Sequence, residues 1–325
     1  VENFCFSTHA VVLVTESGGK DSNKISSDFP NNYIWGLTFF TKTLSLAVFE
    51  HISQVDSWVN SQQQLGLTIG FVPTMGALHA GHASLLELAS QQCDRVVASI
   101  FVNPTQFNNA EDLLKYPRTL DADLALLEAS GCHAVFCPEI GEMYAPEEHT
   151  SQWNYGPLSH SLEGFYRPGH FNGVLTIVKK LFEAVHPNKA FFGEKDFQQL
   201  MLIKRMALEE KFPIDIIAAP TIRESSGLAM SSRNRRLTPS DLPVAISISK
   251  ALLEAADAGR TNTPGQLLLQ TRVKLESVEN LKVEYCALVN ARTFEPIEDW
   301  PSERAVLLVA AFVGEIRLID NVVIP

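Results

Sequence analysis

Short apolar stretches alternate with longer amphipathic ones between residues 67 and 219, and this alternation restricts the fold more than any other feature. Leu67–Val72 is typical of a buried strand closed by Pro73, and a helical pattern follows from Gly81 to Cys93. Such alternation forms βαβ units, so we predict an α/β fold with a Rossmann-like, doubly wound parallel sheet. Further strands are expected at 95–102, 134–137, 190–192 and 214–218, and further helices at 52–59, 120–129, 174–185 and 197–208.

The pattern changes near residue 222, where two helical segments are followed by three strands. The helices are expected near 241–258 and 264–277, and the strands near 282–289, 304–312 and 314–320. This order predicts a smaller C-terminal α+β domain over 222–325, after a Rossmann-like domain over 43–221.

Residues 1–42 do not settle into either periodicity. They lack the basic start and uninterrupted apolar stretch of a signal peptide, since the first basic side chain is Lys20. We interpret them as a poorly ordered extension, or an over-long reading of the gene, that takes no part in catalysis.

Composition excludes several classes of function. A net charge of −11 without basic clusters of the nucleic-acid type disfavours binding to nucleic acid. No run of about 18 apolar residues is present, so we expect no membrane-spanning helix. The five cysteines form no CxxC pair and none stands at zinc-ligand spacing beside histidines. Free thiols in a reducing cytoplasm are therefore expected rather than a disulfide framework.

The segment FVPTMGALHAGH, residues 71–82, follows the first predicted strand of the parallel sheet. Gly76 and Gly81 allow the backbone to approach a ligand closely, and Gly81-His82 opens a helix whose N-terminal N–H groups favour a phosphate. His79 and His82 lie at the same end and can donate hydrogen bonds as charge develops. The glycines do not form a Walker P-loop. A turn with two incidental histidines is the alternative, and zinc is disfavoured because no third ligand is near.

Two further polar segments also follow predicted strands. In FFGEKDFQQL, residues 191–200, Lys195 can neutralise a phosphate, and Gln199, one helical turn beyond, can point to the same pocket. In PTIRESSGLAMSSRN, residues 220–234, adjacent hydroxyls and Arg233 offer several donors to a triphosphate, and Arg235 and Arg236 follow directly. Solvent-exposed loops are the alternative for both segments.

Two smaller signals complete the pattern. Gln106 in FVNPTQF, residues 101–107, follows the second predicted strand and is well placed for a small polar substrate. Arg167 and His170 in LEGFYRPGHF, residues 162–171, add a cation and an imidazole before the helix at 174–185.

Together with YPRTLDAD, residues 116–123, these segments resemble the pantoate–β-alanine ligase family of the HxGH nucleotidyltransferase superfamily, from about Leu46 to the C-terminus. The resemblance implies two steps: pantoate and ATP give pantoyl adenylate and pyrophosphate with Mg²⁺ present, and β-alanine then releases AMP and pantothenate. Positioning and charge stabilisation suit such chemistry. The resemblance also implies a homodimer, and it assigns nucleotide and pantoate binding to the domain over 43–221 and the part of a lid to the domain over 222–325. The composition, as described above, disfavours nucleic-acid and membrane partners and favours the cytoplasm.

Matching position by position, the resemblance implies roles for individual residues. His82 would be the catalytic histidine, with His79 and Lys195 as catalytic partners. Gln106 and Gln199 would hold pantoate, and Gln106 would also lie next to β-alanine. Asp123 is a metal candidate, although a helix N-terminal acid explains it equally well. The residues that would surround ATP are Met75, Gly76, Ala77, Leu78, His79, Ala80, Gly81, His82, Gly193, Glu194, Lys195, Asp196, Ile222, Met230, Ser231, Ser232 and Arg233.

Departures and alternatives bound this interpretation. Ala80 stands where the family usually has Glu, and Thr105 where Met is common, but neither change removes a polar contact at the reacting atoms. A simple adenylyltransferase would use the same HxGH motif to bind phosphate, although the paired glutamines and the C-terminal domain favour the ligase. A non-catalytic nucleotide-binding regulator would have lost site residues, whereas His79, His82 and Lys195 are all present.

Overall fold

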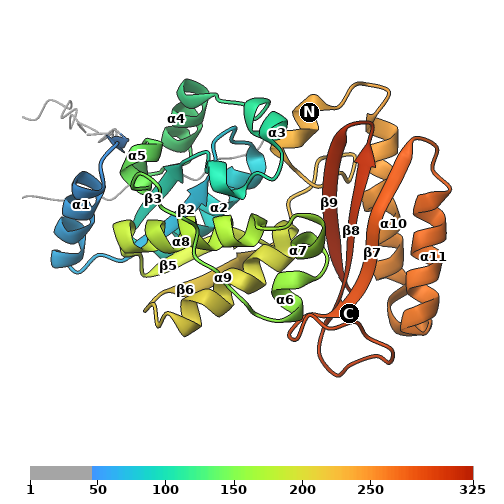
Figure 1. Cartoon of the computed structure of the whole chain (residues 1–325). Helices are drawn as coiled ribbons and strands as arrows, with labels where there is room; N and C mark the ends of the chain where they lie inside the picture. The colour runs from blue at the N-terminus through green and yellow to red at the C-terminus, as the bar shows by residue number, and fades with distance from the viewer. Residues whose placement is uncertain (1–45, 325) are drawn as a thin grey trace, which may run out of the picture. The chain divides into compact units, whose positions relative to one another are not determined.

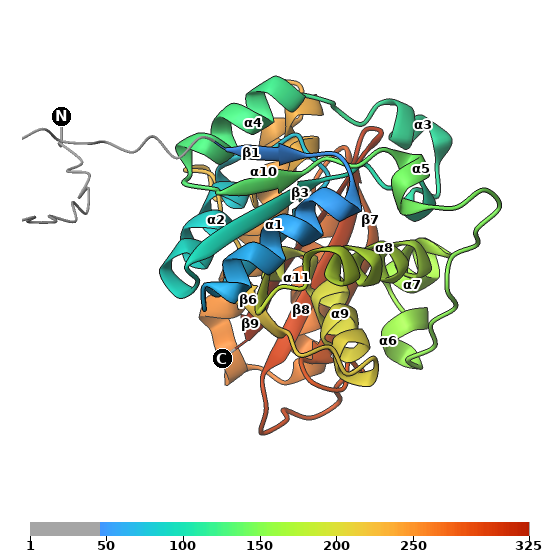
Figure 2. The same ribbon diagram turned by 90° about the vertical axis from the view of Figure 1, so that its left-hand side faces the viewer.

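The structure, a computed structural model, describes residues 46–324, which belong to a single unit of the chain. The predicted extension over 1–42 lies outside the described residues. The described chain forms two sheets, one parallel and one antiparallel (Figures 1 and 2). Within the described residues, no helix is long and apolar enough to cross a membrane. The described cysteines, Cys93, Cys132, Cys137 and Cys286, are free thiols, as the sequence predicts.

The first sheet has six parallel strands in the order β1-β4-β3-β2-β5-β6, which confirms the doubly wound fold. The chain moves from β2 outward through β3 and then returns to place β5 on the opposite side of β2. This reversal between β2 and β5 is the kind of switch point beyond which α/β sheets bind ligands. The strands are β1 (Ala47–Phe49), β2 (Ile69–Thr74), β3 (Arg95–Ile100), β4 (Ala134–Phe136), β5 (Lys189–Gly193) and β6 (Asp215–Ala219).

Helices cover both faces of this sheet because its strands are apolar on both sides. One face buries Phe71 and Phe136 against α1, α8 and α9, and the other buries Val72 and Val135 against α2 and α4. The helices α3, α5, α6 and α7 are short pieces in the connections. The bounds are α1 (Ile52–Gln64), α2 (Ala80–Gln92), α3 (Ala110–Leu114), α4 (Leu120–Ala129), α5 (Ile140–Met143), α6 (Pro157–His160), α7 (Glu163–Tyr166), α8 (His170–Val185) and α9 (Phe197–Glu209).

The C-terminal part is an antiparallel sheet in the order β7-β8-β9. One face packs on α10 and α11, and the other packs against Phe197 at the start of α9, so this sheet lies between its own helices and the first sheet's helices (Figure 1). Almost every residue of β8 is buried because both faces are covered. The bounds are α10 (Leu242–Ala258), α11 (Pro264–Glu276), β7 (Leu281–Asn290), β8 (Ala305–Val313) and β9 (Ile316–Ile324).

Two details of the first sheet differ from expectation. Strand β2 runs through Pro73 to Thr74 instead of closing at the proline. Pairing of β2 with β5 ends at Phe71, so the missing N–H of Pro73 interrupts no bond on that side. The edge strand β1 was not predicted, because three residues are too few to show a period and only pairing with β4 makes them a strand.

Candidate active site

A cavity of about 250 Å³ opens at the carboxyl ends of β2 and β5. Its position at the reversal of strand order agrees with the binding crevice of doubly wound folds. It is lined by Pro73, Thr74, Met75, His79, Gly81, His82, Leu85, Phe101, Gln106, Tyr116, Val174, Ile177, Val178, Leu181, Phe191, Phe192, Gly193, Lys195, Asp196, Gln199, Pro220, Thr221, Ile222, Met230, Ser231, Ser232 and Arg233.

The two histidines form a reciprocal cap at the start of α2. The Nδ1 atom of His79 accepts a hydrogen bond from the N–H of Gly81 at 3.1 Å, and Nδ1 of His82 accepts one from the N–H of His79 at 3.3 Å. The ring centroids lie 4.2 Å apart. A Cβ atom on Gly81 would meet the His79 ring at 3.0 Å, so glycine between the histidines lets the rings pack this closely.

Both imidazoles are neutral at pH 7. Burial, followed by the charges of Lys195 and Arg235, lowers the pKa of His79 to about 4. Burial also lowers the pKa of His82 to about 3, and the next contributions come from His79 and Lys195. Because each Nδ1 accepts a backbone N–H, the single ring proton resides on Nε2. Each ring can therefore act as a neutral hydrogen-bond donor without adding a full charge.

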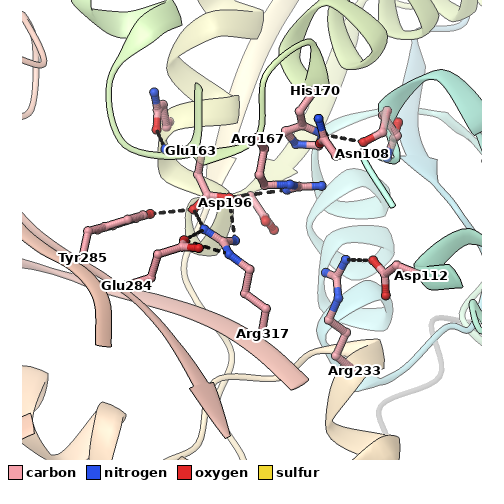
Figure 3. A network of polar contacts seen from close by, with 12 residues as sticks. Asn108, Asp112, Glu163, Arg167, His170, Asp196, Arg233, Glu284, Tyr285 and Arg317 are labelled. Carbon is pink, nitrogen blue, oxygen red and sulfur yellow. Dashed lines mark hydrogen bonds and ion pairs between the residues drawn. The ribbon is translucent and has the colours of Figure 1, made fainter. Parts of the chain in front are cut away.

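The basic segment Met230–Arg236 docks on the loop that carries the histidines. Ser232 Oγ donates to the Ala77 carbonyl at 3.2 Å, and Arg235 Nη2 donates to the Leu78 carbonyl at 2.7 Å. Asp112 on α3 binds Arg233 at 2.8 Å and Arg236 at 3.1 Å, the first of which is visible in Figure 3. These contacts bring Met230, Ser231, Ser232 and Arg233 to the cavity wall.

Strand β9 supports the turn after β5. The amide of Asn321 donates to the carbonyls of Glu194 and Lys195 at 2.9 and 2.8 Å. The neighbouring Asp320 is 4% exposed and pairs with Arg223 at 2.7 Å. The C-terminal sheet thus fixes the backbone at Lys195, whose side chain lines the cavity.

The cavity wall also contains two amide side chains and an apolar surface, which we call its floor. Gln106 lies in a 3₁₀ turn after β3, where Asn103 Nδ2 donates to its side-chain oxygen at 3.2 Å and His170 Nδ1 bonds its backbone carbonyl at 2.8 Å. Burial, and then the charge of Arg167, lowers the pKa of His170 to about 3. Gln199 reaches the same cavity from α9. The floor is an apolar face of α8 made of Val174, Ile177, Val178 and Leu181.

A buried ionic network joins the C-terminal sheet to α7 (Figure 3). Arg317 on β9 binds Glu163 on α7 at 2.6 Å and also pairs with Glu284, while the Tyr285 hydroxyl donates to Glu163 at 2.7 Å. Burial alone would raise the pKa of Glu163, but Arg317 and Arg167 lower it to about 2. The network holds the C-terminal sheet in place against the segment that carries Arg167.

The structure brings most of the predicted site residues together around one cavity. Met75, His79, Gly81, His82, Gly193, Lys195, Asp196, Ile222, Met230, Ser231, Ser232 and Arg233 line it, as do Gln106 and Gln199. Gly76, Ala77, Leu78, Ala80 and Glu194 do not. Ala77 and Leu78 are buried residues of the histidine loop, and Ala80 is exposed at the start of α2. The departure from Glu at position 80 therefore lies outside the cavity wall.

Several residues that shape the cavity were not singled out from the sequence. Asn103 is 1% exposed and orients Gln106, and Tyr116 lines the cavity near Ser232. The apolar floor follows the i, i+3, i+4, i+7 spacing of α8, which the sequence indicates only as a core-facing helix. The spacing is the same for a helix face that packs in the core and for one that lines a cavity, so the sequence pattern alone does not separate them.

Comparisons with known proteins point to one family. The sequence model of the pantoate–β-alanine ligase family matches residues 47–323. A pantothenate synthetase from Bacteroides fragilis is 44% identical over 278 residues, which cover 85% of this chain and 98% of that protein. A pantothenate synthetase from Acidothermus cellulolyticus is 49% identical over 256 residues, covering 78% of this chain and 84% of that protein.

Solved structures agree with the sequence relatives. The crystal structure of pantothenate synthetase from Thermus thermophilus aligns with a TM-score of 0.80 and 39% identity, covering 85% of this chain and 99% of that one. A pantoate–β-alanine ligase from Francisella tularensis, complexed with β-γ ATP and β-alanine, aligns with a TM-score of 0.70 and 36% identity. That alignment covers 85% of this chain and 97% of that one.

Proposed function

This chain belongs to the pantoate–β-alanine ligase family, and we propose that the cavity beyond β2 and β5 is where it joins the substrates of that reaction. The enzyme catalyses the ATP-dependent condensation of pantoate with β-alanine. The observation that carries the site assignment is the composition of the cavity wall. It combines two neutral imidazoles and the cations Lys195 and Arg233 with two amides and an apolar face.

In the first step, a pantoate carboxylate oxygen attacks the α-phosphorus of ATP, and the bond to pyrophosphate breaks. Negative charge grows on the phosphoryl oxygens and on the leaving pyrophosphate. The Nε2–H groups of His79 and His82 donate to the phosphoryl oxygens, and Lys195 and Arg233 stabilise the pyrophosphate. Because the imidazoles are uncharged, they bind most strongly where charge develops, which favours the transition state over the ground state.

In the second step, the β-alanine amine attacks the acyl carbon of pantoyl adenylate, AMP leaves and a proton is released. Gln106 and Gln199 hold the hydroxyl and carbonyl oxygens of the pantoyl group. The floor from Val174 to Leu181 takes up its branched apolar carbon, because a dry apolar surface is favourable for methyl groups and unfavourable for water. Gln106 lies next to the incoming amine.

We propose that Mg²⁺ accompanies ATP and neutralises charge on its phosphates. Within residues 46–324 no group of three or more His, Cys, Asp or Glu side chains is placed to hold a metal ion. The carboxylate of Asp123 is already engaged by hydrogen bonds from Ala77, Leu78 and Thr119. Mg²⁺ in nucleotide sites is bound largely through substrate phosphates and water, so this arrangement needs no protein cage.

We propose that this chain forms a homodimer, as the family suggests. We also propose that it is cytoplasmic, because free thiols and the use of ATP favour that compartment. Sedimentation equilibrium at micromolar concentration tests the first, and a mass of one subunit would contradict it.

One experiment separates the ligase from a simple adenylyltransferase. The protein is mixed with ATP, Mg²⁺ and pantoate, and pyrophosphate is measured before β-alanine is added. We expect about one pyrophosphate per active site in the first phase, followed by AMP release only after β-alanine is added. AMP release that ignores β-alanine would contradict the proposed second step.

A further inference from the structure

Asp123 lies beneath the loop that carries the histidines, although it belongs to the distant helix α4. Its side chain is 2% exposed. One carboxylate oxygen accepts the N–H of Ala77 at 2.9 Å, and the other accepts the N–H of Leu78 at 2.8 Å. The Thr119 hydroxyl donates to the second oxygen at 3.1 Å. Hydrogen bonds from neutral donors to a buried carboxylate are short and strong, so this contact fixes the loop backbone.

The same two residues are also held from the opposite side. The carbonyl of Ala77 accepts from Ser232, and the carbonyl of Leu78 accepts from Arg235. Asp123 therefore binds the N–H groups, and the basic segment binds the C=O groups, of one pair of residues. The Leu78 N–H and the Ala77 carbonyl belong to one peptide unit, so the carboxylate on this N–H polarises the peptide and strengthens its carbonyl as an acceptor for Ser232.

The loop needs such support because its backbone is unfavourable. Gly76 has φ of 77° and Ala77 has φ of 50°, which lies in the left-handed region that costs a non-glycine residue free energy. A Cβ on Gly76 would also meet Asp123 Oδ2 at 3.0 Å, so glycine is required where the carboxylate passes under the chain. The left-handed backbone at Gly76 and Ala77, and the close approach that glycine allows at position 76, let the N–H groups of Ala77 and Leu78 point toward Asp123.

We propose that Asp123 is a positioning residue that couples docking of the Met230–Arg236 segment to the geometry of His79 and His82. It does so by holding the Ala77–Leu78 backbone, and it is not a metal ligand. The Leu78 peptide leads directly into His79, so a shift of this backbone moves both imidazoles. The effect of Asp123 on the reaction rate rests on the proposed function. The coupling between the Met230–Arg236 segment and the histidine loop does not, because it can be measured in the ligand-free protein.

The test compares Asp123→Asn with Asp121→Asn, an exposed acid in the same helical turn. The asparagine is isosteric, but its NH₂ group cannot accept a hydrogen bond, so one loop N–H loses its partner. In hydrogen exchange of the ligand-free enzyme, we expect faster exchange over 75–82 and also over 230–236 in Asp123→Asn, and no change in Asp121→Asn. Faster exchange over 75–82 with an unchanged 230–236 segment would overturn the coupling, as would no change in either.

Kinetics distinguish positioning from metal binding. For Asp123→Asn we expect kcat for pyrophosphate formation to fall by about 10²-fold, the scale for misplaced catalytic groups, while the Mg²⁺ concentration for half-maximal rate is unchanged. A Mg²⁺ requirement raised in proportion, or rescue by Mn²⁺, would identify a metal ligand and overturn the proposal. If the wild-type enzyme itself forms no pyrophosphate, the proposed function fails while the exchange result still decides the coupling.

A double-mutant cycle with Ser232→Ala provides the final check. Asp123 accepts the Leu78 N–H and Ser232 donates to the Ala77 carbonyl, and both groups belong to one peptide unit. The kcat loss from Asp123→Asn should therefore be about fivefold smaller in the Ser232→Ala background. Independent, multiplicative losses would overturn the coupling. Should Asp123→Asn fail to fold, Thr119→Val removes one bond to the carboxylate, and a smaller increase in exchange over both segments is expected. An unchanged exchange pattern in that variant would likewise overturn the proposal.

Discussion

Removal of the His82 imidazole should slow adenylation by about 10²–10³-fold, the usual loss when one preorganised donor to a developing oxyanion is deleted. In the structure, His82 Nδ1 accepts the His79 N–H, which leaves Nε2–H as the group that can donate into the cavity. The variant His82→Ala deletes this donor and also leaves the His79 N–H without its partner. Single-turnover pyrophosphate release with saturating ATP and pantoate measures the effect.

The pH dependence of that loss tests the reasoning more sharply. Because the pKa of His82 is lowered to about 3, the imidazole is neutral throughout the range from about pH 6 to about pH 8. The ratio of wild-type to His82→Ala rates should therefore be constant over that range. A ratio that collapses as the pH rises through about 6.5 would mean that a cationic imidazole carries the effect, and would refute the neutral-donor mechanism. His149→Ala removes an exposed histidine and should change nothing.

Four further outcomes are expected. Burial lowers the pKa of His170 to about 3, so below about pH 6.5 the unfolded chain binds a proton that the folded chain does not. The free energy of unfolding should therefore fall as the pH drops, by roughly 2 kcal/mol from this residue at about pH 5. Equal urea midpoints at about pH 7 and about pH 5 would contradict this expectation. Gln106→Ala should raise KM for pantoate more than KM for ATP, whereas equal increases in steady-state assays would oppose its role. The Met230–Arg233 segment should gain hydrogen-exchange protection on ATP binding, and unchanged exchange would count against a closing loop. Deletion of residues 1–42 should leave kcat intact, and lost activity would show that the extension contributes.

Much of the fold was predictable because periodicity is a local property. Helix α4 coincides with the predicted range 120–129, and α9 and β7 lie within one residue of theirs at each end. Strand β1 could not be found, because its three residues become a strand only by pairing with β4. The extent of β2 through Pro73 also depends on where a neighbouring strand stops pairing, which no local pattern records.

The site divides in the same way. The sequence by itself determined which chemical groups follow β2, β5 and β6, since strand ends and motifs are local: two histidines, Lys195 and the basic segment. Only the tertiary structure decided how those groups behave. Burial and nearby cations make the histidines neutral, and residues distant in sequence, such as Asn321 and Asp123, fix the backbones that carry them. Desolvation and long-range hydrogen bonds depend on which segments meet in space, so they arise only when the chain has folded.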